Sequence, residues 1–267
     1  MRILLTNDDG IESPGLLSAH RALRLAGHEV VTVAPDGERS GQSHSVNLRS
    51  ALRVKEVAMP GGGSGYGVDG SPADCAHLGC LALAGEPIDL VVSGINTDTN
   101  LGYDANYSGT VGAALEAAAL GYPALAASLE RSPAQDWELA GQVTLEAANL
   151  YQGWGIPRGV LVNLNIPAEI GDPLWVWAPL NLIPARERYA VERDAGGRIL
   201  GYRRTRELGK STYMAGSDVD YFRQGRITLS PVGPVRSERK TLARLQNQGF
   251  GNPAGPDRVF KRAKKSF

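Results

Sequence analysis

The chain has 267 residues, of which 42% are hydrophobic and 21% charged, and its 28 basic residues balance 28 acidic ones. This composition supports a sizeable core, and the length fits one α/β domain with extensions. The charge balance gives no indication of a nucleic-acid or membrane partner. The start of the chain lacks a signal-peptide pattern, and no apolar stretch approaches the roughly 18 residues of a membrane span, so we predict a cytoplasmic protein.

The first ten residues combine a predicted buried strand with an acidic turn. Residues 3–5 are an uninterrupted apolar run, typical of a parallel strand that is covered on both faces. Asp8 and Asp9 follow, and Gly10 lets the backbone turn sharply. Paired carboxylates at the carboxyl end of such a strand suit a hard cation bound through oxygen. A solvated loop with a helix cap explains this stretch equally well.

A helix and a second strand follow the acidic turn. Pro14 is typical of a helix start and Gly27 of a helix end, and residues 29–34 are again apolar. Strand, helix and strand in this order predict a right-handed βαβ unit with parallel strands. No glycine-rich dinucleotide fingerprint lies between the first strand and the helix, which argues against a dinucleotide site of the usual kind.

The rest of the chain continues the alternation of strands and helices. Further strands are predicted at residues 48–57, 66–68, 87–96, 123–129, 160–166, 174–179 and 226–232, and further helices from Ser71, Ser108 and Ser132. The only cysteines, Cys75 and Cys80, fall on the helix from Ser71. They lie about 140° apart around it, which disfavours a disulfide and favours two buried thiols.

Polar residues follow three of the predicted buried strands. Asp8 and Asp9 follow the first, the hydroxyl-rich loop 38–45 follows the second, and Asn96 ends the strand at 87–96. Because parallel strands end at one edge of a sheet, one cleft could gather these groups. The donors are all oxygen, which suits Mg²⁺ or Mn²⁺ better than zinc.

A possible anion site lies at the start of the alanine-rich helix. Ser108, Gly109 and Thr110 offer hydroxyls, unpaired backbone N–H groups and the positive end of the helix dipole. Helix capping alone would explain Ser108. A hard cation beside an anion of phosphate size would imply phosphoryl chemistry.

The stretch 184–206 alternates charged and apolar residues around Gly196 and Gly197, which predicts a protruding, arginine-rich hairpin. It is either a solvated flap or an arm that covers a site or grips another subunit. A lone hairpin is marginal in water, and Arg and Tyr are enriched where subunits meet. We therefore predict a homodimer or homotetramer joined by this arm and by the C-terminal segment 234–267, which includes a short basic helix at 236–246.

Several motifs together resemble the SurE family of survival-protein nucleotidases. They are NDDG at 7–10, RSG at 39–41, SPADC at 71–75, VVSGIN at 91–96 and YSGTVGAA at 107–114, with weaker matches at 163–167 and 216–220. The resemblance implies a single α/β domain over residues 1–267, a Rossmann-like three-layer sandwich with a mostly parallel central sheet. It also implies removal of phosphate from nucleoside 5′-monophosphates with one divalent metal ion per subunit, Mg²⁺ or Mn²⁺.

The resemblance also assigns site residues. The implied metal ligands are Asp8, Asp9, Ser40 and Asn96. The implied phosphate contacts are Asn100, Ser108, Gly109 and Thr110. Two positions depart from the family pattern: Asp98 stands where glycine is usual, and Ser71 stands where threonine is commoner.

The sequence leaves two mechanisms and a rival function open. One aspartate of the pair Asp8 and Asp9 could move a proton to or from a metal-bound water, or one could be phosphorylated covalently. His44 is the only histidine in a predicted site loop, and His77 is expected to be structural. The rival function is a metal-dependent nucleotide sensor without turnover. Such a sensor needs the anion site but not the paired acids, which weighs against it.

Overall fold

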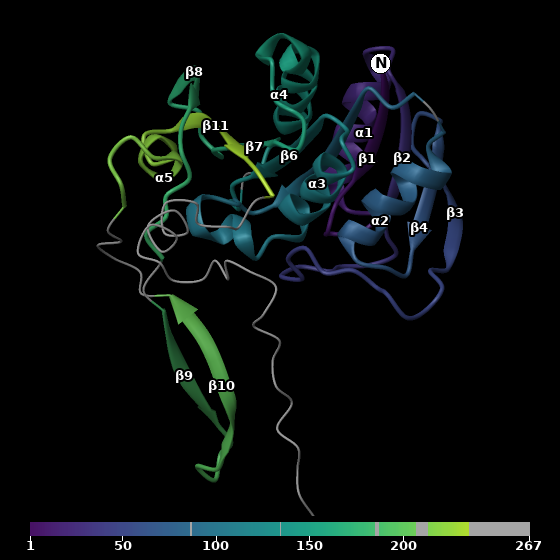
Figure 1. Ribbon diagram of the computed structural model, residues 1–267. Helices are drawn as coiled ribbons and strands as arrows, with labels where there is room; N and C mark the ends of the chain where they lie inside the picture. The colour runs from purple at the N-terminus through teal and green to yellow at the C-terminus, as the bar shows by residue number, and fades with distance from the viewer. Residues whose placement is uncertain (86, 134, 185–186, 207–212, 235–267) are drawn as a thin grey trace, which may run out of the picture. The chain divides into compact units, whose positions relative to one another are not determined.

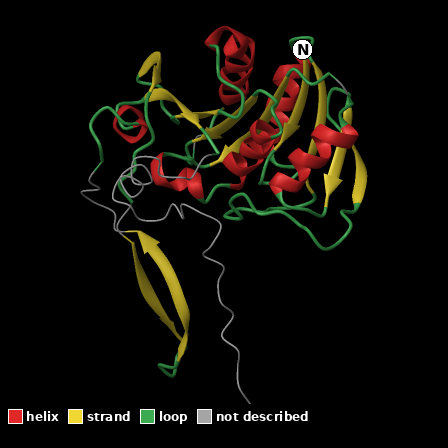
Figure 2. Cartoon of the chain, viewed as in Figure 1, coloured by secondary structure: helices red, strands yellow, loops and turns green. Residues whose placement is uncertain are grey.

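The fold is built on one large sheet with helices on both faces, as the computed structural model shows (Figure 1, Figure 2). The structure describes residues 1–85, 87–133, 135–184, 187–206 and 213–234. Helices α1 (Pro14–Leu25) and α4 (Trp137–Leu150) pack on one face. Helices α2 (Pro72–Leu78) and α3 (Gly109–Ala119) pack on the other. The predicted three-layer α/β sandwich is therefore confirmed.

Nine strands form the sheet in the order β3-β4-β2-β1-β5-β6-β7-β11-β8. They are β1 Arg2–Thr6, β2 Glu29–Pro35, β3 Val54–Ala58, β4 Ser64–Val68, β5 Leu90–Thr97, β6 Ala124–Leu129, β7 Leu161–Ile166, β8 Asp172–Trp177 and β11 Arg226–Val232. Strands β4, β2, β1, β5, β6 and β7 run parallel, while β3 and β11 pair antiparallel with β4 and β7. The carboxyl ends of β1, β2 and β5 thus meet at one edge, as predicted.

The central strands are apolar because both of their faces are covered. Residues 3–5 of β1 are fully buried, and so are residues 161 and 162 of β7. Helix α1 approaches the carboxyl end of β5 closely at Gly15, where a Cβ would lie 2.0 Å from the carbonyl oxygen of Ile95. This contact holds the turn after β1 against the end of β5.

Two predicted starts are wrong by five or more residues, and local side-chain hydrogen bonds give the reason. The strand predicted at 48–57 begins only at Val54, because the Asn47 side chain accepts from the backbone N–H groups of Arg49 (3.0 Å) and Ser50 (3.1 Å) and folds a turn there. The helix predicted from Ser132 begins at residue 137, because Asp136 caps it by accepting from the N–H of Leu139.

Other sequence predictions agree with the structure. Ser71 caps α2 in a full capping box with Asp74, so serine serves at the position where the family more often has threonine. Cys75 and Cys80 are free and buried. Burial raises the pKa of both thiols well above the ordinary cysteine value, which is typical of unreactive core cysteines.

The predicted hairpin arm is present. Strands β9 (Glu187–Arg193) and β10 (Ile199–Arg206) pair antiparallel and form a separate two-stranded sheet. A short helix, α5 (Asp218–Phe222), precedes β11. The predicted C-terminal association segment and its basic helix lie outside the described residues, apart from the first position. Among the helices that the structure describes, none has the length and apolarity to cross a membrane.

Candidate active site

A pocket of about 380 Å³ opens where β1 and β5 end and α3 begins. Five of the predicted site residues line it, from four separate stretches of the chain: Asp8, Ser40, Asn96, Asn100 and Ser108. The structure thus brings Asp8, Ser40 and Asn96 to one pocket, as expected from the strand ends, but not the second carboxylate, Asp9. Asp9, Gly109 and Thr110 lie next to this pocket rather than along its wall.

Asp8 is the buried carboxylate of the pocket, with only 3% of its surface exposed. The Thr110 hydroxyl donates a hydrogen bond to Asp8 Oδ1. Burial raises the pKa of the Asp8 carboxyl to about 6, and the Asp9 charge adds to the rise while the Thr110 bonds oppose it. A cation beside Asp8 would favour the charged carboxylate again, so the environment of this residue fits a metal ligand.

Gly109 lets helix α3 reach Asp8. A Cβ at residue 109 would lie 2.8 Å from the Cβ of Asp8 and 3.0 Å from the Cγ of Pro72, closer than side-chain carbons approach. Thr110 is fully buried, and its hydroxyl is committed to Asp8. In this structure the two residues after Ser108 therefore support Asp8 and do not face the open pocket.

Asp9 is joined to β5. Its Oδ2 accepts from the backbone N–H of Thr97 at 2.9 Å. Asp9 lines a second pocket, which shares Thr97 and Arg131 with the Asp8 pocket. The two carboxylates of the acidic turn thus face two adjoining pockets.

Asn96 and Ser40 add neutral oxygens. The Asn96 side chain donates through Nδ2 to the carbonyl of Asp98 at 2.6 Å, which leaves its Oδ1 as an acceptor in the pocket. The backbone N–H of Arg39 donates to the carbonyl of Asp8 at 2.7 Å and so brings Ser40 beside it. No ligand-like cluster of three or more His, Cys, Asp or Glu side chains occurs in the described residues. Carboxylates with neutral oxygens are the donors that Mg²⁺ and Mn²⁺ accept.

Ser108 and Asn100 form the other side of the pocket. Ser108 caps α3 by accepting from the N–H of Val111 at 3.1 Å. Side chains of β6 and β7 hold Asn100 in place. Its N–H donates to Asn165 Oδ1 and its Nδ2 to Ser128 Oγ, both at 2.8 Å, while Asn163 Nδ2 donates to its carbonyl at 2.8 Å.

The three residues that hold Asn100 were not predicted as site residues, although the stretch 163–167 matched the family pattern. Ser128, Asn163 and Asn165 are fully buried in β6 and β7. Polar side chains inside otherwise apolar strands were the available signal, since buried polar groups occur where a hydrogen-bond partner needs them.

The pocket mouth carries further residues without a predicted role. Arg204, from β10, lies over the Tyr107 ring, 5.1 Å from its centre, and pairs with Glu187. Asp98 has φ 127°, a conformation that favours glycine, which fits the glycine usual at this position in the family. The Asp98 carboxylate lies 3.5 Å from Arg131 Nε. Both groups are largely exposed, so this ion pair contributes little to stability.

Neither histidine named above lines the pocket. His44 and His77 both contact Glu116, through Nε2 at 2.6 Å and Nδ1 at 2.7 Å. His77 is therefore a satisfied structural residue, as expected. His44 belongs to the loop that carries Ser40 but is bonded to helix α3.

Residues 3–179 match the family described as Survival protein SurE. The chain belongs to the SurE family. It is 40% identical over 236 residues to the 5′-nucleotidase SurE of Rhodopirellula baltica, an alignment that covers 87% of this chain and 92% of the relative. It is 41% identical to the 5′-nucleotidase SurE 1 of Thermus thermophilus, covering 87% and 91%.

A solved structure agrees with this family assignment. The crystal structure of the SurE protein from Aquifex aeolicus superposes with a TM-score of 0.78 and 31% sequence identity. The superposition covers 92% of this chain and 99% of that one. The resemblance inferred from the sequence motifs is therefore confirmed over nearly the whole SurE fold.

Proposed function

We propose that the chain is a 5′-nucleotidase that hydrolyses nucleoside 5′-monophosphates to nucleoside and phosphate with the help of a divalent cation. The observation that carries the proposal is the buried Asp8 carboxylate, held by Thr110 in one pocket with Asn96 and Ser108. The relatives named above are 5′-nucleotidases. A sensor without turnover is not favoured, because it does not need the paired acids Asp8 and Asp9 and because the relatives are named as nucleotidases.

Asp8, Asp9, Ser40 and Asn96 would hold the cation, Mg²⁺ or Mn²⁺, one per subunit. When bound, such a cation neutralises phosphate charge and lowers the pKa of a coordinated water. The donor set fits because it contains oxygen atoms only.

Residues of this chain would bind and orient the phosphate. Ser108 and the amino end of α3 present a hydroxyl and the positive end of the helix dipole. Asn100 enters the pocket in a fixed position, because Ser128, Asn163 and Asn165 hold it. A preorganised contact of this kind needs no rearrangement when the substrate arrives.

Proton transfer would fall to the acidic pair. Asp9 Oδ2 accepts from the backbone N–H of Thr97. The aspartate that the cation does not fully occupy would take a proton from an attacking water or give one to the leaving oxygen. Attack by Asp8 or Asp9 itself, through a phospho-aspartate, is the competing route.

We also propose that the protein is a cytoplasmic homodimer or homotetramer that binds neither nucleic acid nor membranes. The exposed apolar side chains of the arm support association: Tyr189, Leu200 and Tyr202 are each more than 60% exposed. Such residues at the centre of an interface contribute strongly to binding.

The first prediction concerns the cation. Purified protein with Mg²⁺ or Mn²⁺ should release phosphate from at least one nucleoside 5′-monophosphate, and EDTA should abolish the release, because the site relies on an added cation. Re-adding excess Mn²⁺ after EDTA is the control and should restore the rate. Absence of phosphate release from every 5′-monophosphate with either metal would refute the proposed function.

The second prediction concerns Ser108. Ser108→Ala should lower kcat/KM about tenfold, as loss of one hydrogen bond to a charged group does, and leave Mn²⁺ affinity within about twofold. The change also removes a helix cap worth about 1 kcal/mol. Asp136→Ala, which removes the cap of α4 away from the pocket, is the matched control. Equal losses of activity in both variants would show that Ser108 acts through helix stability alone.

A further inference from the structure

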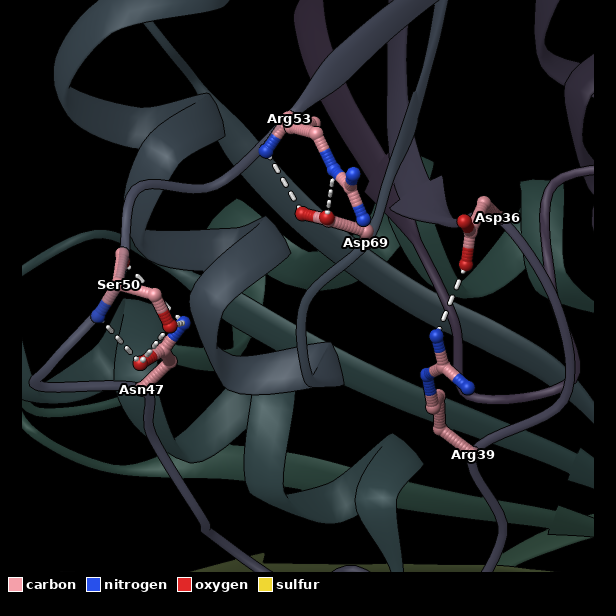
Figure 3. A network of polar contacts seen from close by, with 6 residues as sticks. All are labelled: Asp36, Arg39, Asn47, Ser50, Arg53 and Asp69. Carbon is pink, nitrogen blue, oxygen red and sulfur yellow. Dashed lines mark hydrogen bonds and ion pairs between the residues drawn. The ribbon is translucent and has the colours of Figure 1, made fainter.

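The loop between β2 and β3 carries Ser40 and is folded by its own polar contacts. Figure 3 shows the ion pair of Arg39 with Asp36 (2.9 Å) and the turn closed by Asn47 and Ser50. These contacts shape the loop internally. They do not explain why it stays against the pocket.

On one side of Ser40 the loop is tied to the acidic turn through the N–H of Arg39, which donates to the carbonyl of Asp8. Ser40 itself is exposed, and its hydroxyl donates to Glu38, a neighbour in the same loop. A second attachment beyond Ser40 is therefore needed to fix its hydroxyl relative to Asp8.

The segment just before α3 and the helix itself supply the second attachment. Ser43 donates through its N–H to the carbonyl of Tyr107 (3.1 Å) and through its hydroxyl to the carbonyl of Asn106 (2.6 Å). A Cβ at Gly112 would lie 2.4 Å from the carbonyl oxygen of Ser43, so the loop backbone lies directly on the helix. This contact explains the glycine in the middle of α3.

Further along, the loop is bound at α2, where Ser71 donates to the carbonyl of Ser45 and Asp74 accepts from the N–H of Asn47. Between these points and Ser40, one side chain of α3 adds a contact. The Glu116 carboxylate is hydrogen-bonded to two histidines: His44 from the loop contacts Oε2, and His77 from α2 contacts Oε1. Only 16% of the Glu116 side chain is exposed. Burial alone would raise the pKa of Glu116, but the hydrogen bonds and charges of His77 and His44 outweigh it and lower the pKa. The carboxylate thus stays charged between two imidazoles.

We propose that Glu116 is a positioning residue for the metal site: through His44 it holds the loop so that the Ser40 hydroxyl remains next to Asp8. This inference rests on the proposed function, in which Ser40 is a cation ligand. Glu116 touches neither the pocket nor a predicted substrate contact. Its effect on the cation would therefore pass through the loop. Without the contact between Glu116 and His44, Ser40 would have to be ordered each time the cation binds, and this would weaken the affinity.

The test measures Mn²⁺ binding to the substrate-free protein from the EPR signal of the free ion. Glu116→Ala and His44→Ala should each weaken Mn²⁺ binding about three- to tenfold, the effect of losing one hydrogen bond of ordinary net strength, because the lost contact acts on the cation only through the loop. The double variant should bind no more weakly than either single variant, because both changes break one link. Glu116→Gln, which keeps an acceptor and the side-chain length, should recover most of the affinity.

A matched control separates positioning from general stability. Glu29→Ala removes a surface ion pair with Arg2 at the other end of β2 and should leave Mn²⁺ affinity unchanged. If Glu116→Ala does not fold, His44→Ala and Glu116→Gln carry the test. Mn²⁺ affinities within twofold of the parent in folded Glu116→Ala or His44→Ala protein would overturn the inference. The Mn²⁺ binding measurement uses no substrate. If the parent binds Mn²⁺ but releases no phosphate, that result would therefore refute the proposed function and leave this inference to be decided by the binding data.

Discussion

Replacing Asp8 by asparagine should reduce phosphate release about 10³-fold or more, since the change removes a cation ligand and a candidate proton carrier together. Asparagine has nearly the same shape, and its Oδ1 can still accept from the Thr110 hydroxyl. Helix α3 should therefore keep its contact with the acidic turn. The readout is the rate of phosphate release at saturating Mn²⁺.

The same variant should be at least as stable as the parent when metal is absent. Burial is the main reason why the pKa of Asp8 lies near 6 and not at its ordinary value of 3.8. An acid whose pKa is raised in the folded state destabilises the fold once the pH exceeds that pKa, and the loss fades as the pH falls toward the ordinary value. The metal-free parent should thus gain stability mainly as the pH falls from about 6 toward 4, between the two pKa values, and Asp8→Asn should lack this component.

Thermal unfolding in EDTA across this pH range checks the expectation. Asp69→Asn is the matched control, because Asp69 lies outside the pocket and pairs with Arg53 at the surface. This control should keep its activity. An Asp8→Asn protein with activity within a few-fold of the parent would show that Asp8 is a turn residue only.

The sequence predicted the location of the site because the rule behind it is topological. Parallel strands end at one edge, so Asp8 and Asn96 had to meet once their strands were recognised. Finer placement depends on side-chain contacts that spacing does not determine. Thr110 lies beside the pocket, because its hydroxyl donates to the buried carboxylate of Asp8, which is 102 positions away in the chain.

Contacts between segments far apart in the chain lay beyond sequence reasoning for the same reason. In the sequence, Asn163 and Asn165 only interrupt an apolar strand. In the structure they are hydrogen-bonded to Asn100, which explains why polar residues occur there. Glu116 and His44 are 72 positions apart, and each alone resembles an ordinary surface residue. A single sequence contains no signal for such a pair, since register and loop path decide whether they meet.

The arm carries the second large prediction. Across the β9–β10 ladder Val191 faces Tyr202 and Tyr189 faces Arg204, so these side chains share one face of a hairpin that pairs with no other described strand. A two-stranded sheet of this kind is marginal by itself in water. An apolar face on a hairpin needs a partner surface, and a second copy of the chain provides one by symmetry.

Deleting residues 188–203 and joining the ends with a short Gly-Ser link should convert the oligomer to single chains. The deletion keeps Glu187 and Arg204, whose ion pair sits at the pocket mouth, so the pocket itself is retained. Light scattering measures the mass, which should fall to that of one shortened chain, below 28.4 kDa. A full-length variant with Val191→Ser and Tyr202→Ser is the companion: it keeps the arm but removes its apolar face, and should weaken association in the same direction. If the deleted protein keeps the parent's oligomeric mass, or if the parent itself is a single chain, the arm does not join subunits.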